Sequence, residues 1–227
     1  MPIDGFHIRL CRPGDESAVY DVCLKTGAAG GDATGIHRDP RALGNVYVGP
    51  YLRFEPSLAF VLEDRAGVCG YVLGALDSKT FHERVSKEWL PPLRAIFPDP
   101  SGDPQGWDPT ARIHHLYHHP DTFCPEGAYP SHIHIDLLAR ARGKGLGSMM
   151  VELLRDELRA KGSPGMHLGF DADNHGALLF YRKLGFRELV RRWHAEAGTV
   201  FMGMRLHLTS NGSAPASSAA GQGAVAP

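Results

Sequence analysis

The sequence predicts an α/β domain in which helices flank a mixed β-sheet. Strand-like and helical segments alternate along the chain in the order β-α-β-β, a long insertion, and then β-α-β-α-β-β. Helices interleaved with strands in this way are typical of layered domains built on one sheet. The 227 residues can bury a sizeable core without disulfide bonds or metals to support it.

The first half of the chain supplies one strand, one helix and a hairpin. A brief N-terminal alternation precedes a helix for which Asp15 is the expected N-cap. Residues 27–57 are rich in Gly, Pro and Asp, which predicts loops with a short helix near Tyr51. Residues 58–76, LAFVLEDRAGVCGYVLGAL, predict a β-hairpin, because apolar, β-branched and aromatic residues fill both arms around the turn DRAG.

The segment 78–130 interrupts this regular pattern. It contains Trp89, Trp107, many prolines and the histidine-dense run RIHHLYHHP. An insertion of this length between regular elements is either functional or mobile.

The second half returns to regular alternation. SHIHIDLL predicts a strand, RARGKGLG a loop, and residues 148–161 a helix that buries Met149, Met150, Leu153, Leu154 and Leu158. A strand MHLGF, a loop DADNHG, a helix ALLFYRKLG and two strands around 187–193 and 200–208 follow. The tail 209–227 contains no large apolar residue beyond one Val, so we expect it to be disordered.

Composition narrows the classes of function. The formal net charge is −1 and no basic stripe is visible, so we expect no nucleic-acid partner. No apolar run approaches the ~20 residues that cross a bilayer, and no N-terminal targeting pattern is present, so we expect a cytoplasmic protein without a membrane partner. The four cysteines form no CxxC pair, and we expect them to be reduced and mostly buried.

Three glycines stand where a helix should start. Each glycine in RGKGLG costs a helix roughly 1 kcal/mol relative to Ala, so helix formation does not explain them. The segment fits neither the P-loop spacing GxxxxGK[ST] nor the dinucleotide spacing GxGxxG. It does fit R/Q-x-x-G-x-G/A, in which backbone N–H groups converge on a pyrophosphate at the helix start. The alternative is a flexible loop that merely begins the helix.

A second motif follows at residues 174–186, where NHGALLFYRKLGF completes the pattern N-x-x-A-x-x-F-Y-x-K-x-G-F. Together the two motifs resemble the GNAT superfamily of acyl-CoA-dependent N-acetyltransferases, from Ile8 to about Leu208 without the insertion. This resemblance implies a mostly antiparallel central sheet with splayed middle strands. It also implies one domain, residues 1–208, with an insertion at 78–130.

Two further segments, FVLEDRAGVCGYVLGALD and YPSHIHIDLL, together with the tryptophan-containing insertion, look like the acetyltransferase-like C-terminal domain of animal O-GlcNAcases. This chain has no room for the glycosidase part, so no sugar hydrolysis is expected.

The resemblance implies acetyl-CoA as cosubstrate and assigns residues to it. The strand ending at Leu137 and Leu138 would hold the pantetheine arm and acetyl carbonyl through its backbone. Asn174 would bond the pantetheine or phosphate edge. The pyrophosphate would be held by Arg142, Gly143, Lys144, Gly145, Leu146, Gly147 and Ser148.

The catalytic residues are less sharply defined. Tyr181 matches the family's usual general acid; the alternative is a helix tyrosine packed beside Phe180. For the general base, alternation places His134 and Asp136 on one strand face together with His132. A histidine backed by a carboxylate suits removal of a proton from an ammonium. The family's base positions instead fall on Ser131 or Ile133, unless a β-bulge shifts the count. Structural polar residues buried under the insertion are the alternative.

The histidine run supplies two pairs one helical turn apart, His114 with His118 and His115 with His119. Such pairs can hold zinc, but a zinc site needs a third or fourth ligand and none is apparent, so we predict no metal. The insertion is instead expected to form one wall of the acceptor site, with these histidines, Trp89, Trp107 and Tyr117 as candidate contacts.

The sequence therefore predicts an acetyl-CoA-dependent N-acetyltransferase that moves an acetyl group to a primary amine by direct attack in a ternary complex. A non-catalytic module of the same fold, binding acetyl-CoA or a protein partner, is the alternative. The joint presence of the glycine loop, Asn174 and Tyr181 favours the enzyme.

Overall fold

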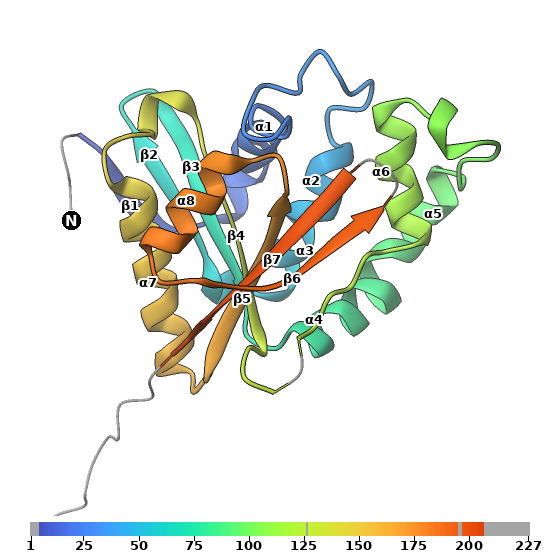
Figure 1. The fold of residues 1–227 in the computed structure, drawn as a ribbon. Coiled ribbons are helices and arrows are strands. Elements are labelled where there is room, and N and C mark those ends of the chain that lie inside the picture. The colour runs from blue at the N-terminus through green and yellow to red at the C-terminus, as the bar shows by residue number, and fades with distance from the viewer. Residues whose placement is uncertain (1–4, 126, 195–196, 207–227) are drawn as a thin grey trace, which may run out of the picture.

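A computed structural model describes residues 5–125, 127–194 and 197–206. Its strands form one seven-stranded sheet in the order β1-β2-β3-β4-β5-β7-β6 (Figure 1). Neighbouring strands are antiparallel except β4 and β5, which are parallel, so the sheet is mixed and mostly antiparallel as predicted. The strands are β1 (His7–Leu10), β2 (Ala59–Asp64), β3 (Gly67–Ala75), β4 (Ser131–Leu137), β5 (Gly165–Asp171), β6 (Arg187–His194) and β7 (Ala197–Arg205).

Helices cover both faces of the sheet (Figure 1). Alternation along β3 divides the core, since Val72 packs in the cluster under α7 while Tyr71 and Leu73 pack in the cluster with α1. One face carries α1 (Glu16–Leu24), α2 (Ala42–Tyr47) and α3 (Gly49–Phe54); the other carries α7 (Leu146–Ala160) and α8 (His175–Lys183). Short helical turns are η1 (Pro13–Asp15), η2 (Pro56–Leu58) and η5 (Ala139–Ala141).

Helix α7 buries most of its predicted face. Met150, Leu154 and Leu158 are fully buried, four residues apart along one stripe. Leu153 is partly buried at the edge of this stripe. The prediction for Met149 was wrong: it is 38 % exposed, because one residue of rotation carries it off the buried stripe towards solvent.

The insertion is helical. It forms α4 (Ser78–Arg84), the π-helical η3 (Val85–Trp89), α5 (Leu90–Ile96), η4 (Pro104–Gly106) and α6 (Pro109–His118). The carboxylates of Asp77 and Asp108 cap α4 and α6 by accepting the N–H groups of Thr80 and Ala111. Pro91, Pro92, Pro104 and Pro109 stand in first helical turns, where their missing N–H costs nothing.

Several local predictions can be compared with the structure. The hairpin of β2 and β3 and the helix at Tyr51 are confirmed, whereas α2 was not predicted. Asp15 precedes α1 but makes no capping bond to it; its carboxylate accepts instead from Arg12 N and the Arg9 guanidinium. Cys23 and Cys69 are buried, Cys11 is half-buried and Cys124 is exposed, all as free thiols.

Two further points concern the chain as a whole. The expected disordered tail, 209–227, lies outside the described residues, as do residues 207 and 208 of the last predicted strand. Within the described part of the chain, no helix has both the length and the apolar character that crossing a membrane requires.

Candidate active site

Strands β4 and β5 separate soon after they meet. They pair only through Ser131 with Met166 and His132 with His167. Beyond that point β4 continues along β3 to Leu137, and β5 continues along β7 to Asp171. The facing edges of the two strands therefore have no ladder partner in the described structure, which leaves backbone groups for a ligand to satisfy. The predicted splay is present.

A cavity of about 790 Å³ opens at this separation. From the sheet it is lined by His132, His134 and Asp136 of β4 and by Gly169 of β5, and from α8 by Tyr181. The cavity thus gathers the candidate catalytic residues of strand and helix into one space.

The glycine loop presents unpaired donors. The backbone N–H groups from Gly143 to Ser148 have no acceptor among the described residues, and Met149 N makes the first helical bond, to Gly145 O. Gly143 and Gly145 adopt φ of 72° and 76°, in the left-handed region that favours glycine. A Cβ at either would meet open space, so the loop is accessible. Unpaired N–H groups at the start of a fifteen-residue helix are chemically suited to an anion.

Gly147 has a different reason to be glycine. A Cβ there would lie 3.1 Å from Leu137 Cδ1 and 3.3 Å from Phe180 Cζ. The missing side chain therefore allows the first turn of α7 to approach β4 and α8. Its N–H remains unpaired and adds to the loop's donors.

The basic residues of the loop differ in their freedom. The Arg142 guanidinium donates to Leu137 O and Gly30 O, both at 2.7 Å, and so ties the loop to the 27–31 segment. Lys144 is exposed. The N–H of Leu138 donates to Cys69 O at 2.8 Å, so this donor is engaged within the protein, as is the Leu137 carbonyl that accepts from Arg142.

Asn174 caps α8 and lines the cavity. Its Oδ1 accepts from Ala177 N at 2.9 Å, and its Nδ2 lies 3.4 Å from Ala29 O. The residue thus fixes the start of the helix that carries Tyr181.

Tyr181 is 8 % exposed and lines the cavity. Its ring packs against Phe170, Phe180 and Phe186, with centroids 5.1–5.5 Å away, while its hydroxyl has no hydrogen-bond partner among the described residues. Burial, reinforced by the charge of Asp136, raises the pKa of Tyr181 well above its ordinary value. The hydroxyl therefore keeps its proton at neutral pH and can donate it.

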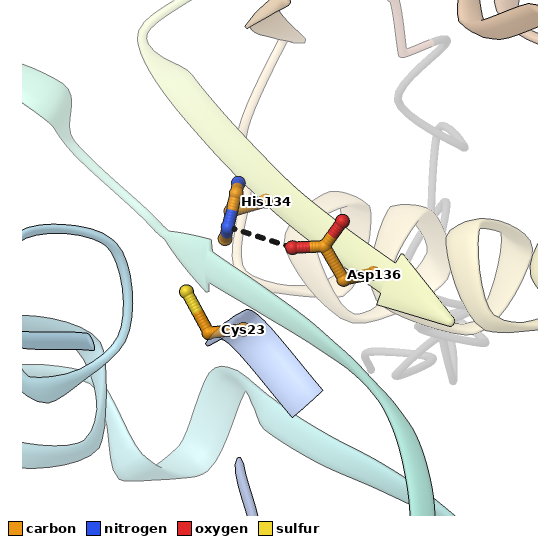
Figure 2. Close-up of side chains that lie close together, drawn as sticks. All are labelled: Cys23, His134 and Asp136. Atoms are coloured by element: carbon orange, nitrogen blue, oxygen red, sulfur yellow. Dashed lines mark ion pairs between the residues drawn. The ribbon is translucent and has the colours of Figure 1, made fainter. Parts of the chain in front are cut away.

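A hydrogen-bonded cluster joins β3 to β4. The Tyr71 hydroxyl donates to Asp136 Oδ2 at 2.5 Å and lies 3.0 Å from His134 Nε2, which is itself 3.3 Å from the same carboxylate oxygen. Figure 2 shows His134 and Asp136 side by side on β4, with Cys23 of α1 facing them. Burial raises the pKa of the Cys23 thiol to about 12, so it stays protonated and is no nucleophile.

This cluster determines the tautomer of His134. The single hydroxyl proton of Tyr71 is committed to Asp136, so the Tyr71 oxygen accepts from His134. Neutral His134 therefore carries its proton on Nε2, and the lone pair is on Nδ1. The Tyr47 ring stacks on the imidazole at 5.7 Å and holds its plane.

A second histidine sits where the strands part. His132 Nδ1 lies 2.7 Å from Ser78 Oγ, which donates its own proton to Pro130 O. His132 must therefore donate from Nδ1, and Nε2 keeps a buried lone pair with no partner in the described structure. Burial, with the neighbouring histidines His82 and His167, lowers the pKa of His132 well below its ordinary value.

The geometry of splayed strands and glycine loop agrees with the match of a family model. Residues 46–186 match the Acetyltransferase (GNAT) family. The chain belongs to this family.

Sequence similarity to curated proteins relates this chain to particular members of the GNAT acetyltransferases. It is 29 % identical over 206 residues to the Protein O-GlcNAcase of Rattus norvegicus and 28 % identical over 204 residues to that of Mus musculus. Both alignments cover 88 % of this chain and 22 % of the relative, so the chain spans about a fifth of those proteins' length. The chain is thus related to an O-GlcNAcase, and only over its acetyltransferase-like part.

Solved structures share the fold. That of SsHAT is 35 % identical with a TM-score of 0.80, and the alignment covers 89 % of this chain and 98 % of SsHAT. The structure of yncA from Salmonella typhimurium with its cofactor acetyl-CoA has a TM-score of 0.51 at 17 % identity, covering 94 % and 99 % of the two chains. At that identity yncA shows likeness of fold alone.

The insertion lines the cavity that opens between β4 and β5, but not through the residues that the sequence suggested. Trp89 donates its indole N–H to Asn45 O, and Trp107 donates to Ser101 O at the surface. Tyr117 is fully buried and bonds Asn45 and Ala42 O. None of these three side chains lines the cavity, and neither do the four histidines of the run. The insertion residues at the cavity are Phe81, His82, Val85, Leu90, Pro109, Arg112, Ile113, Leu116, Pro120, Asp121 and Phe123.

The structure also shows where the two alternative positions for the general base, Ser131 and Ile133, lie. The register of β4 on β3 is continuous from His132 to Leu137, so no bulge shifts the count there. Ser131 is buried and bonds Leu76 O and Ser163 Oγ, and Ile133 lies in the core under α7. Neither offers a base. Sequence reasoning also missed Tyr71, although a tyrosine within the apolar run VCGYVL was a signal for a buried hydroxyl that needs a partner.

Proposed function

We propose that this chain is an acetyl-CoA-dependent N-acetyltransferase that acts on a primary amine. The observation that carries the proposal is the set of unpaired N–H groups from Gly143 to Ser148 beside the separation of β4 and β5. Such donors are suited to a pyrophosphate, and hydrogen bonds to a charged acceptor contribute about 1.5–3 kcal/mol each. The open edge of β4 next to them is suited to the amide-rich pantetheine arm.

The residues fit acetyl-CoA as follows. Gly143, Gly145, Leu146, Gly147 and Ser148 offer backbone N–H groups to the pyrophosphate, and Lys144 adds a mobile charge. Arg142 acts through its bonds to Leu137 O and Gly30 O, which hold the loop in place. Leu137 offers the open edge of β4. Asn174 positions α8, and its amide lies at the cavity.

His134 is the proposed general base. Its Nδ1 lone pair accepts a proton from the acceptor ammonium, while Tyr71 and Asp136 orient the ring and stabilise the imidazolium that forms. The neutral amine nitrogen then forms a bond to the acetyl carbon in a ternary complex, the carbon–sulfur bond breaks, and the nitrogen releases its surplus proton to water, which afterwards reprotonates Tyr181. Tyr181 donates its hydroxyl proton to the departing sulfur.

The acceptor is expected to enter from the side of the insertion. The unpartnered Nε2 of His132 accepts a hydrogen bond from an amine N–H, and Asp121, whose carboxylate lies 3.6 Å from the Arg192 guanidinium, lines the same cavity. An unpaired buried acceptor of this kind is costly unless a ligand donor satisfies it. Both features favour an amine. We include residues 1–208 in this domain, with 78–130 as the acceptor wall.

The first experiment is calorimetric titration of acetyl-CoA into the wild type and Gly145→Glu. A glutamate there places a negative side chain in the proposed phosphate cradle, so binding should be lost. Gly162→Glu is the matched control, because Gly162 also has positive φ and open space around its Cβ but lies at the other end of α7. Equal binding by all three proteins would contradict the assignment of the loop.

The second experiment separates the enzyme from the non-catalytic alternative. Release of free CoA thiol is measured over a panel of small amines, peptide N-termini and lysine peptides. Acceptor-dependent release supports the enzyme. Tight binding of acetyl-CoA without turnover on any acceptor would support a binding module.

A further inference from the structure

A second cluster of ligand-type side chains lies on the insertion, outside the cavity. His115 and His119 stand one turn apart on α6, and Asp99 follows α5 on the neighbouring loop. Asp99 Oδ1 lies 3.1 Å from His115 Nδ1, and Asp99 Oδ2 lies 2.6 Å from His119 Nε2. Figure 1 shows α5 and α6 packed together at one side of the molecule.

We propose that Asp99, His115 and His119 bind one zinc ion. Two imidazole nitrogens and a carboxylate oxygen are ordinary zinc ligands, and three protein ligands leave a fourth position for water. One potential ligand atom from each residue lies within 4.8 Å of those from the other two. A tetrahedral ion with bonds of about 2.0–2.1 Å separates its ligands by roughly 3.3 Å, so the two separations between Asp99 and the histidines need to widen only slightly.

The cluster is already organised for this role. The two imidazole rings are stacked with centroids 4.3 Å apart, so both project towards Asp99 from one face of α6. The Trp107 ring packs against His115 at 4.9 Å and shields one side. All three ligand side chains are partly exposed, which gives an ion a path of entry.

Asp99 is the ligand that the sequence could not supply. It lies 16 residues before His115 and 20 before His119, with no motif linking them. Without it, the i, i+4 histidine pair lacks a third ligand, and sequence analysis predicted no metal. The fold brings the loop after α5 against the C-terminal turn of α6 and completes the set.

Zinc bound here would join that loop to α6. The same helix lines the cavity through Ile113 and Leu116, so the ion would stiffen the proposed acceptor wall. The inference concerns metal binding alone and does not require acetyl-CoA. Its test is therefore independent of the proposed function.

The test is titration of zinc chloride into the full chain after treatment with a chelator, followed by calorimetry. We expect one site in the wild type, with affinity at least tenfold weaker in His119→Gln and in Asp99→Asn. His7→Gln is the matched control, because His7 is an exposed histidine on β1 whose carboxylate contact is the 3.5 Å pair with Glu63. It should bind zinc as the wild type does.

Two further readouts complete the test. Zinc should raise the melting temperature of the wild type and of His7→Gln but not of His119→Gln, and the metal-free melting temperature reports whether each variant is folded. Cys23, His134 and Asp136 form the other cluster of ligand atoms among the described residues. Binding that survives in His119→Gln but is lost in Cys23→Ser would overturn the proposal, as would absence of any zinc-dependent heat in the wild type.

Discussion

The Tyr71 hydroxyl donates a 2.5 Å hydrogen bond to the Asp136 carboxylate on the neighbouring strand. Tyr71 and Asp136 are paired in the register of β3 on β4, so their side chains lie on the same face of the sheet. His134, two residues earlier on β4, shares this face and completes the cluster. The catalytic arrangement proposed above depends on this relationship.

Tyr71→Phe is expected to lower kcat about tenfold with little change in KM for acetyl-CoA. The substitution removes the oxygen that orients His134 Nε2 and the donor that holds Asp136, but leaves the ring that fills the core. Steady-state kinetics on the acceptor found in the amine screen measure both constants. An unchanged kcat would mean that the cluster is structural.

His134→Gln and Asp136→Asn distinguish the base from its supporting group. Removing the base in His134→Gln should lower kcat by about 100-fold or more. In Asp136→Asn the side-chain amide still occupies the place of the carboxylate, so kcat should fall by less. Comparison of kcat for the two variants on the same acceptor is the measurement. A larger loss in Asp136→Asn would reverse the two roles.

Tyr181→Phe is expected to lower kcat about 100-fold while leaving acetyl-CoA affinity and melting temperature close to the wild type. The hydroxyl makes no hydrogen bond to the described residues, so its removal costs the fold little, and the ring contacts with Phe170 and Phe186 remain. Kinetics, calorimetry and thermal melting are compared on the same preparation. Full activity in Tyr181→Phe would remove Tyr181 from the mechanism.

Gly147→Ala and Gly145→Ala should both lower stability, but for different reasons, and only Gly145→Ala should also weaken acetyl-CoA binding. At Gly147 the added methyl group presses on Leu137 and Phe180, which should cost about 1 kcal/mol of unfolding free energy. At Gly145 the positive φ costs about 1–2 kcal/mol, and the methyl group also enters the proposed phosphate cradle. Urea denaturation and acetyl-CoA titration separate the effects. A loss of affinity confined to Gly147→Ala would contradict this division.

Acid should destabilise the folded protein through its buried and half-buried histidines. The pKa values of His132, His82 and His167 are lowered from 6.5, chiefly by burial, so the folded state keeps these rings neutral. As pH falls below about 6.5 the unfolded state binds protons that the folded state excludes, which favours unfolding. Each such proton increases the loss of unfolding free energy by up to about 1.4 kcal/mol per pH unit.

The measurement is urea denaturation at several pH values between 5 and 7.5. His132→Gln should show a shallower dependence on pH than the wild type, whatever its absolute stability. Parallel pH dependences for the two proteins would show that His132 does not contribute.

The sequence by itself determined much of the sheet and of the glycine loop. Two-residue alternation put His132, His134 and Asp136 on one face of β4, and the glycines marked the start of α7, because both signals are carried by neighbouring residues. Resemblance between motifs placed Tyr181 and Asn174 at the same site. These predictions needed no knowledge of distant contacts.

Only the tertiary structure brought Tyr71 to Asp136 and Asp99 to His115. Each pair joins segments whose spacing follows no motif, so periodicity could not reveal it. The insertion shows the same limit of prediction from sequence, because its helices were not predicted. The side chains that reach the cavity also differ from the conspicuous Trp89, Trp107 and Tyr117. Which face of a helix meets a cavity depends on how it packs against its neighbours, and that is decided by the whole core.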